Sequence, residues 1–239
     1  MIFMIFCRKL PIITTLFQGH DNSTMRLTSY GYSSLITTVI FCSLACAGGF
    51  FLSPVPGTAL SAIATLFLLF SLWFYRDPDR QVPQNPDLIL APADGTIVLR
   101  KTVDHPFTGQ SSTLVSIFMS PFNVHVNRIP CNGNIVHLQY HQGQFLMAFD
   151  HRSMSNNERM ETGLENGSSK VLFSQVSGFV ARRIVNTLKT GECVMAGSRF
   201  GMIKFGSRVD IYLSPDIAVE VTTGIKTLAG ETVLGRRTA

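Results

Sequence analysis

The feature that most constrains this chain is a stretch of 49 positions, between Arg26 and Arg76, that contains no charged residue. Two apolar runs fill it, roughly Leu35 to Leu52 and Ala59 to Tyr75. Each run approaches the length of about 20 residues that a helix needs to cross the hydrocarbon core of a bilayer. The segment between them, residues 53–57, reads Ser-Pro-Val-Pro-Gly and is typical of a turn. We therefore expect an apolar helical hairpin that lies in a membrane.

Basic residues flank this apolar block on both sides, whereas the segment between its two runs has none. The flanking basic residues are Arg8, Lys9, Arg26, Arg76 and Arg80. The positive-inside rule then places both ends in the cytoplasm, which predicts an inner-membrane protein with its main domain on the cytoplasmic side. The aromatic run Trp73–Tyr75 is typical of an interfacial belt. A pair of buried core helices, or a hairpin that dips into the bilayer without crossing it, is the alternative.

The composition supports a lipid-associated protein over a nucleic-acid-binding one. The chain is 46% hydrophobic and 15% charged, and its net charge of +5 is not gathered into a basic run. We interpret the excess charge as attraction to an anionic membrane surface, and we expect no nucleic-acid partner. Three parts are predicted: residues 1–30 as an N-terminal extension, 31–76 as the hairpin and 77–239 as the main domain. Because Met25-Arg26 would make a natural start, residues 1–24 are interpreted as an upstream-start extension.

After Tyr75 the sequence changes to short apolar runs separated by glycine, proline and asparagine. Their alternation and β-branched content predict strands, with turn signals at short intervals. One helix is expected, over Gly178 to Leu188, because its apolar residues follow helical spacing. The predicted fold is therefore mostly β (α+β), a compact β-sandwich or hybrid barrel that carries an N-terminal hydrophobic helical hairpin.

Near the C-terminus, Gly206-Ser207 lies between two strand-like runs. An isolated Gly-Ser pair is ordinarily a turn, in which glycine supplies backbone freedom and serine caps. Two other segments change that interpretation. They are "APADGTIV", which contains Asp94, and "FMSPFNVHVNRIP", which contains His125 and Arg128.

Together these segments resemble the short, pyruvoyl-dependent proenzymes of the phosphatidylserine decarboxylase family. The resemblance runs from about Ala59 to the C-terminus, and its landmarks occur in the family's order: Arg76-Asp77-Pro78, Pro92-Ala93-Asp94-Gly95, Ser120-Pro121 through Pro130, Asn157-Glu158-Arg159 and "RFGMIKFGSRVDIYL". It implies decarboxylation of membrane phosphatidylserine to phosphatidylethanolamine and carbon dioxide. It also implies self-cleavage between Gly206 and Ser207 into a β chain (1–206) and an α chain (207–239), which stay together as a heterodimer.

The chemistry explains why these two residue types are adjacent. Glycine places no side chain beside its own carbonyl, so the Ser207 hydroxyl can approach that carbon from a strained turn. An acyl shift, elimination and hydrolysis would then convert Ser207 into an N-terminal pyruvoyl group. Its ketone can react with the substrate amine and accept the electrons released as carbon dioxide leaves. We expect no metal and no external organic cofactor, and the histidines at 105, 137, 141 and 151 have no partner at metal-ligand spacing.

The resemblance assigns catalysis to Ser207, His125 and Asp94. Longer family members carry two histidines three positions apart in this region, and the second falls on Arg128 here. Either His125 takes both proton-transfer roles with Asp94 orienting it, or another group is the base for self-cleavage. Arg128 would then be free to hold a substrate carboxylate or phosphate. The resemblance also places two residues in a substrate-proximal loop, namely His141 and Phe145.

Two other functions are open at this point. A membrane-tethered carrier of the lipoyl type would display a lysine at a hairpin tip, and Lys204 is the nearest candidate, although it lies within a strand-like run. A pyruvoyl enzyme could instead act on another amine-bearing acid, but the apolar runs favour a lipid substrate. A homo-oligomer is neither required nor excluded.

Overall fold

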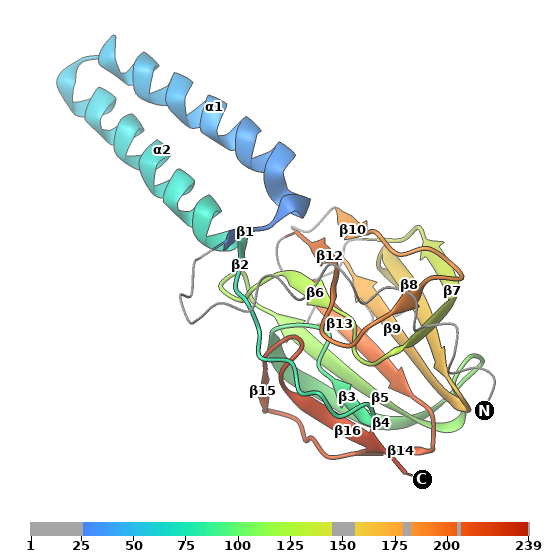
Figure 1. The fold of residues 1–239 in the computed structure, drawn as a ribbon. Coiled ribbons are helices and arrows are strands. Elements are labelled where there is room, and N and C mark those ends of the chain that lie inside the picture. Colours follow the sequence, from blue (N-terminus) through green and yellow to red (C-terminus); the bar gives the residue numbers. More distant parts are fainter. Residues whose placement is uncertain (1–25, 145–155, 179–182, 205–206, 239) are drawn as a thin grey trace.

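The computed structural model describes residues 26–144, 156–178, 183–204 and 207–238. They form a β-rich body from which two helices project side by side (Figure 1). After a single 3₁₀ turn, η2 (Ser29–Gly31), the projecting helices are α1 (Tyr32–Phe50) and α2 (Pro54–Phe74). The expected apolar hairpin is therefore present at the N-terminal side of a mostly β protein.

The connection between the helices is shorter than the predicted turn over residues 53–57. Helix α1 ends at Phe50, and Ser53 already precedes the first residue of α2. Pro54 and Pro56 lie in the first turn of α2, where a missing backbone N–H leaves no helical hydrogen bond unmade. Proline at this position therefore starts the second helix.

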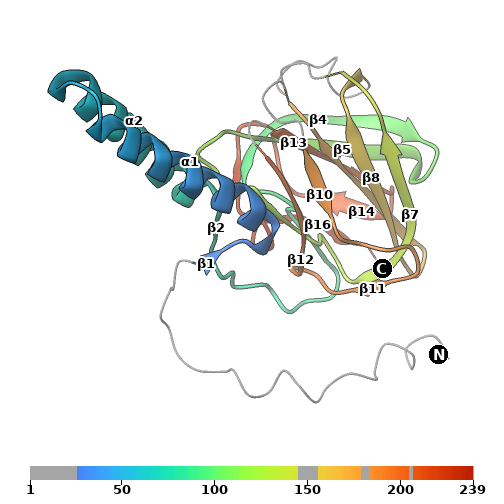
Figure 2. The same ribbon diagram turned by 90° about the horizontal axis from the view of Figure 1, so that it is seen from above.

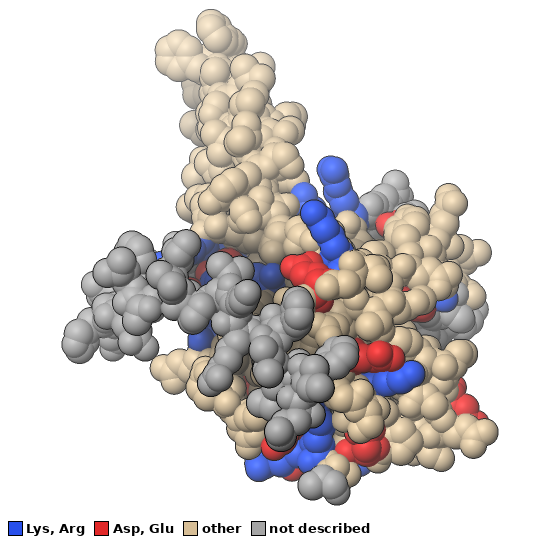
Figure 3. All heavy atoms as spheres, turned by 45° about the vertical axis from the view of Figure 1, so that its right-hand side comes forward, with Lys and Arg blue, Asp and Glu red and all other residues tan. Residues whose placement is uncertain are grey.

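Both helices are long and apolar enough to cross a membrane, by length and composition. Only 17% of each apolar window is buried inside the molecule, which argues against a pair of buried core helices. In Figure 3 the visible face of the hairpin carries no charged atom, and the first blue and red atoms appear where it joins the body. A surface of this kind is stable in hydrocarbon and unfavourable in water.

The body contains a large antiparallel sheet and three small ones (Figures 1 and 2). The large sheet runs in the order β11 (Cys193–Val194), β7 (Gly133–His141), β8 (Arg159–Asn166), β9 (Ser169–Val176), β13 (Ser207–Leu213), β5 (Gly109–Met119), β4 (Gly95–His105) and β15 (Lys226–Thr227). The small sheets are β10 (Ile184–Asn186), β12 (Arg199–Ile203) and β6 (Val126–Arg128); β14 (Ile217–Val219), β16 (Val233–Arg237) and β3 (Leu88–Leu90); and β1 (Arg26–Leu27) with β2 (Arg76–Asp77).

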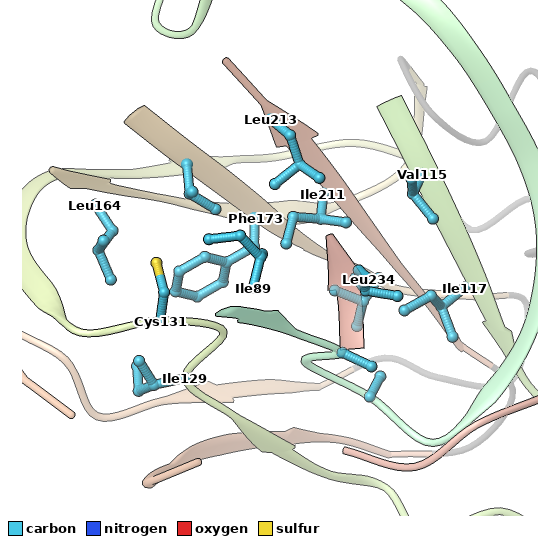
Figure 4. Close-up of a cluster of buried hydrophobic side chains, with 14 of the residues drawn as sticks. Ile89, Val115, Ile117, Ile129, Cys131, Leu164, Phe173, Ile211, Leu213 and Leu234 are labelled. Atoms are coloured by element: carbon cyan, nitrogen blue, oxygen red, sulfur yellow. The ribbon is translucent and has the colours of Figure 1, made fainter. Parts of the chain in front are cut away.

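The core lies between the large sheet and the strands that face it. In Figure 4, side chains of β5, β8, β9 and β13 meet those of β3 and β16, among them Phe173, Ile211 and Leu234. Alternate residues of β13 point into this core, since Val209, Ile211 and Leu213 are fully buried members of it. The two-layer arrangement confirms the predicted sandwich-like β domain.

The helix predicted over Gly178 to Leu188 is wrong. Residues 179–182 lie outside the described part, but Ile184–Asn186 form strand β10, which pairs antiparallel with β12. The apolar residues that suggested a helix contribute instead to the body, where Ile184 and Leu188 pack against the main core. Short apolar runs cannot separate helix from strand by periodicity alone.

The hairpin and the body meet through a small apolar cluster of Leu35, Phe74, Tyr75 and Met202. Phe74 is fully buried and Tyr75 is 3% exposed, so this part of the Trp73–Tyr75 run does not form the predicted interfacial belt. A polar contact reinforces the junction, because Lys204 Nζ donates to Ser34 Oγ at 2.7 Å. The hairpin is thus packed onto the β domain.

The helices of the hairpin approach each other at two glycines. A Cβ added to Gly57 would collide with the Gly49 carbonyl oxygen, and one added to Gly49 would collide with the Gly57 carbonyl oxygen and Ser61. Small residues at such a crossing let helices pack closely where no hydrophobic driving force is available.

We therefore predict that Gly57→Val forces the helices apart and destabilises the anchored protein by about 1–3 kcal/mol, the usual cost of overpacking. The measurement is thermal unfolding in detergent, with Ala59→Val as the matched control because Ala59 is exposed on the same helix. Equal melting temperatures for the two variants would contradict the close crossing.

Candidate active site

Ser207 is the first residue of β13 and lies on the face of the strand that points into the core. Its side chain is fully buried, and its register partner across the ladder is Met119 of β5. The hydroxyl contacts the Met119 thioether, with Oγ and Sδ 3.4 Å apart. Thioether sulfur is a weak acceptor, so the hydroxyl sits in a dry site with poor hydrogen-bond compensation. Gly206 lies outside the described residues.

His125 is also fully buried, at the end of the connection from β5 to β6. Its Nδ1 is 2.9 Å from the Asn123 carbonyl oxygen. Because a carbonyl can only accept, Nδ1 carries the proton and Nε2 presents a lone pair. Nε2 has no hydrogen-bond partner among the described residues. The imidazole is therefore oriented as a base with its reactive nitrogen available.

The pKa of His125 is lowered from 6.5 to about 4, mainly by burial; the hydrogen bond to the Asn123 carbonyl opposes this shift and the nearby Arg76 charge adds to it. The imidazole is therefore neutral at pH 7. The ring of Phe74 contributes to this burial, since the two ring centroids are 4.4 Å apart. The last residue of the apolar helix α2 thus covers the histidine.

A local turn sets the direction of His125. The Asn123 side-chain oxygen accepts from the Ser120 backbone N–H at 2.8 Å and from the Ser120 hydroxyl at 2.9 Å. These two hydrogen bonds form a turn over residues 120–123, just after Met119, which is the register partner of Ser207. On the other side, the His125 carbonyl accepts from the Ile203 N–H at 3.4 Å, shortly before the predicted cleavage point. Two short segments therefore bring the surroundings of His125 and Ser207 together.

Asp94 is buried but does not orient His125. Its two oxygens bind the Arg80 guanidinium at 2.8 and 3.0 Å, and one of them also accepts the Ala229 backbone N–H at 2.7 Å. Burial raises the pKa of Asp94, with Arg80 and the Ala229 N–H opposing the rise. The Asn123 carbonyl therefore has the orienting role toward His125 that the sequence analysis predicted for Asp94.

Arg128 points away from this site. Its guanidinium donates to the Gly197 carbonyl at 3.0 Å and to the Pro78 carbonyl at 2.9 Å, and it lies 3.3 Å from an Asp77 oxygen. Arg128 is the last residue of β6, and none of these contacts involves His125. These contacts fasten the segment after the hairpin to the body and give no support to substrate binding by Arg128.

Strand alternation instead brings Asn127 to the site, a residue that the sequence analysis missed. Asn127 is fully buried, and its Nδ2 lies 3.9 Å from the Met119 sulfur that Ser207 also contacts. Gln175 fixes the amide by donating to Asn127 Oδ1 at 2.9 Å, and Asn186 donates to Gln175 in turn at 3.1 Å. The signal in the sequence was its position two residues after His125, because residues two apart in an extended segment point the same way.

The structure does not place the other predicted substrate-binding residues, His141 and Phe145, at this site. His141 Nε2 lies 3.1 Å from a Glu161 oxygen. Register pairs place His141 in one row with Arg159, Val176 and Arg208, which is the opposite sheet face from Ser207. Phe145 lies outside the described residues.

The described residues contain no group of three or more His, Cys, Asp or Glu side chains arranged to hold a metal ion. Lys204, the carrier candidate, is 7% exposed and bonded to Ser34 at the hairpin junction. A carrier lysine must swing freely from an exposed turn, and this one is packed against the anchor.

Comparison with known proteins gives a consistent result. The family model for phosphatidylserine decarboxylase matches residues 67–235. A phosphatidylserine decarboxylase proenzyme of Chlorobaculum parvum is 58% identical over 88% of this chain and 99% of its own length. Proteins of the same name from Chlorobaculum tepidum and Chlorobium phaeobacteroides (strain DSM 266) are 58% and 56% identical, over 89% and 87% of this chain and 98% and 99% of theirs.

We predict that His125 makes stability fall with acid. A folded pKa of about 4 against 6.5 means that the unfolded chain binds more protons between these values, so stability is lost as pH falls through that window. The shift corresponds to about 3 kcal/mol. His125→Asn keeps a donor for the Asn123 carbonyl and does not titrate.

The measurement is denaturant unfolding from pH 4 to 7 for Ser207→Ala with and without His125→Asn, so that both proteins are uncleaved. We expect the free energy of unfolding to depend less on pH in the double variant than in Ser207→Ala alone. Parallel curves would show that His125 is not held neutral by the fold.

Proposed function

The chain belongs to the phosphatidylserine decarboxylase family, and from this premise we propose that it cleaves itself between Gly206 and Ser207 and then decarboxylates phosphatidylserine to phosphatidylethanolamine. The observation that carries the proposal is that two fully buried groups, Ser207 and His125, lie on neighbouring segments of the chain. Among the described residues, the Ser207 hydroxyl has the Met119 thioether as its hydrogen-bond partner, and the neutral His125 imidazole has no partner at Nε2. A weak nucleophile and an available base are the parts that self-cleavage needs.

Self-cleavage uses atoms of the chain and one water molecule. Ser207 Oγ loses its proton to His125 and attacks the Gly206 carbonyl carbon; the C–N bond breaks, and the amide nitrogen takes a proton. Loss of the Ser207 α-proton and departure of the Gly206 carboxylate from Cβ then leave dehydroalanine. Water adds, ammonia leaves, and residues 207–239 begin with a pyruvoyl group.

The surroundings of Ser207 fit that group. Its methyl derives from Ser207 Cβ, which sits beside the Met119 thioether, an apolar neighbour better suited to a methyl than to a hydroxyl. The ketone supplies an electrophile for the substrate amine and an electron sink for the departing carbon dioxide. Ser207 pairs with Met119 of β5, and from Arg208 onward β13 is paired with both β5 and β9, so the new terminus stays fixed after the cut.

His125 has a second role after cleavage. Burial keeps the imidazole neutral, so it can accept a proton at Nε2 and return one to the carbon that lost carbon dioxide. Phe74 excludes water on one side, which protects that carbon from stray protonation. Asp94 takes no part in proton transfer in this scheme and instead binds the buried Arg80 guanidinium.

The site lies at the foot of the hairpin, which favours a lipid substrate over a soluble amino acid. A substrate that arrives from the bilayer reaches the Phe74–His125 contact without leaving the membrane surface. We place the hairpin in the cell (inner) membrane and the β domain on its cytoplasmic side, with the two cleaved chains remaining together as a heterodimer. The buried Lys204 argues against the carrier alternative.

The test is Ser207→Ala. We expect a single uncleaved chain on a denaturing gel and no release of carbon dioxide, whereas the parent chain gives two fragments. Ser116→Ala is the matched control, because Ser116 is buried on the neighbouring strand and its hydroxyl has no hydrogen-bond partner in the described part of the chain. This variant should be cleaved normally. Normal cleavage of Ser207→Ala would refute the proposal, as would activity that survives cyanoborohydride in the presence of phosphatidylserine.

Asp94→Asn separates structure from chemistry. We expect cleavage to persist, because the Asn123 carbonyl orients His125, while stability falls by about 3 kcal/mol as the buried Arg80 loses its carboxylate. Cleavage is read on a gel and stability by thermal melting. A variant with parental stability that fails to cleave would show that Asp94 belongs to the chemistry.

A further inference from the structure

Arg76 is fixed at the foot of the hairpin by two backbone carbonyls. It is the first residue of β2 and follows α2 after a single residue, Tyr75. One terminal nitrogen donates to the Trp73 carbonyl at 2.8 Å, and the other donates to the Phe122 carbonyl at 2.6 Å. The guanidinium carbon also lies 4.1 Å from the centre of the Trp73 ring. A long flexible side chain is therefore held in one place at the membrane end of the body.

The positive charge of Arg76 has no acidic partner within 4 Å among the described residues. The nearby arginines differ: Arg80 binds Asp94 at 2.8 Å, and Arg199 and Arg128 share Asp77. An arginine has five N–H donors, and the two bonds above leave three of them for another acceptor. Fixed position, full charge and unused donors together make a site for an anion.

This charge is close to the reactive groups. Burial is the main cause of the pKa shifts of both His125 and Asp94; the Arg76 charge adds to the lowering at His125 and opposes the rise at Asp94. Its partner Phe122 is next in the chain to Asn123, whose carbonyl orients His125. An anion bound at Arg76 would therefore lie beside the reaction site, on its membrane side.

An apolar groove lies on the other side of the same junction. It has a volume of about 310 Å³ and is lined by residues of β1, α1 and α2, including Leu27, Leu35 and Leu72. Leu27 is the register partner of Arg76 in the β1–β2 pair. An apolar groove on one side of this strand pair and a cation without an acidic partner on the other have the polarity of a phospholipid, with its acyl chain and its phosphate.

We infer that Arg76 is the subsite for the phosphodiester group of the lipid substrate, with an acyl chain along this groove. The inference rests on the proposed function. The substrate carboxylate is the weaker candidate ligand, because an arginine bound to it would stabilise the charge that decarboxylation must remove and so would oppose the reaction. The phosphodiester keeps its charge throughout, and binding it positions the amine without that penalty.

The experiment compares Arg76→Gln with Arg26→Gln, using water-soluble dihexanoyl phosphatidylserine. Arg26 lies on the paired strand β1, is exposed, and only approaches Asp79 at 3.9 Å, so it controls for general attraction to anionic lipid. We expect Arg76→Gln to be cleaved normally, with KM raised about 10- to 100-fold, as for loss of a charge-assisted bond, and kcat within a few-fold of the parent. Arg26→Gln should keep the parental KM.

A second readout uses dihexanoyl phosphatidylmethanol, a phosphodiester lipid that has neither amine nor carboxylate. It should inhibit the parent competitively and inhibit Arg76→Gln about tenfold or more weakly. The acid limb of the rate profile should also move to higher pH in this variant, because a charge that lowers the pKa of His125 is gone. A purely structural role for Arg76 would not move the inhibition constant and this limb together.

An unchanged KM and inhibition constant in Arg76→Gln, or equal changes in Arg26→Gln, would overturn the subsite while leaving the proposed function intact. If Arg76→Gln fails to cleave, Arg76→Lys keeps the charge and loses the fork, and a parental inhibition constant in that variant would overturn the subsite as well. A parent chain that neither cleaves nor releases carbon dioxide would instead refute the proposed function.

Discussion

The contact between Phe74 and His125 is the interaction on which the rest of the structure depends. It joins the last residue of the apolar helix α2 to the proposed base, and it contributes to the burial that lowers the pKa of the imidazole to about 4. The apolar hairpin is therefore a wall of the site as well as the proposed attachment to the bilayer. Loss of this contact would admit water, return the histidine toward its ordinary pKa and separate the reactive groups from the surface through which a lipid arrives.

The β domain supplies the other half of the site through strand alternation. Ser207 begins a strand whose alternate residues fill the core, so its hydroxyl is delivered into a dry interior beside the Met119 thioether. Leaving a hydroxyl without a good acceptor costs on the order of 1–3 kcal/mol. A chain that removes this hydroxyl by its own chemistry relieves that cost, which gives a physical reason for placing the serine there.

Much of this could be predicted from the sequence, and the errors share a cause. The charge-free span predicts the hairpin, and period-two runs predict the β domain, because both are local patterns. The helix over Gly178 to Leu188 failed because pairing with β12 decides that segment, and Phe74 was assigned to the interface because its burial comes from residues far along the chain. Arg128 was predicted to bind substrate because of its position in a motif. The geometry of β6 instead points Arg128 toward Asp77 and points Asn127 toward the site.

The central claim is that the chain converts its own Ser207 into the reactive group. The most direct measurement is the mass of the C-terminal fragment, residues 207–239, isolated from active enzyme. Our account predicts a fragment lighter than the serine-initiated peptide by the mass of one ammonia molecule, with no free amino terminus. A serine-initiated fragment, or an active preparation that consists of the intact 26.4 kDa chain, would contradict it.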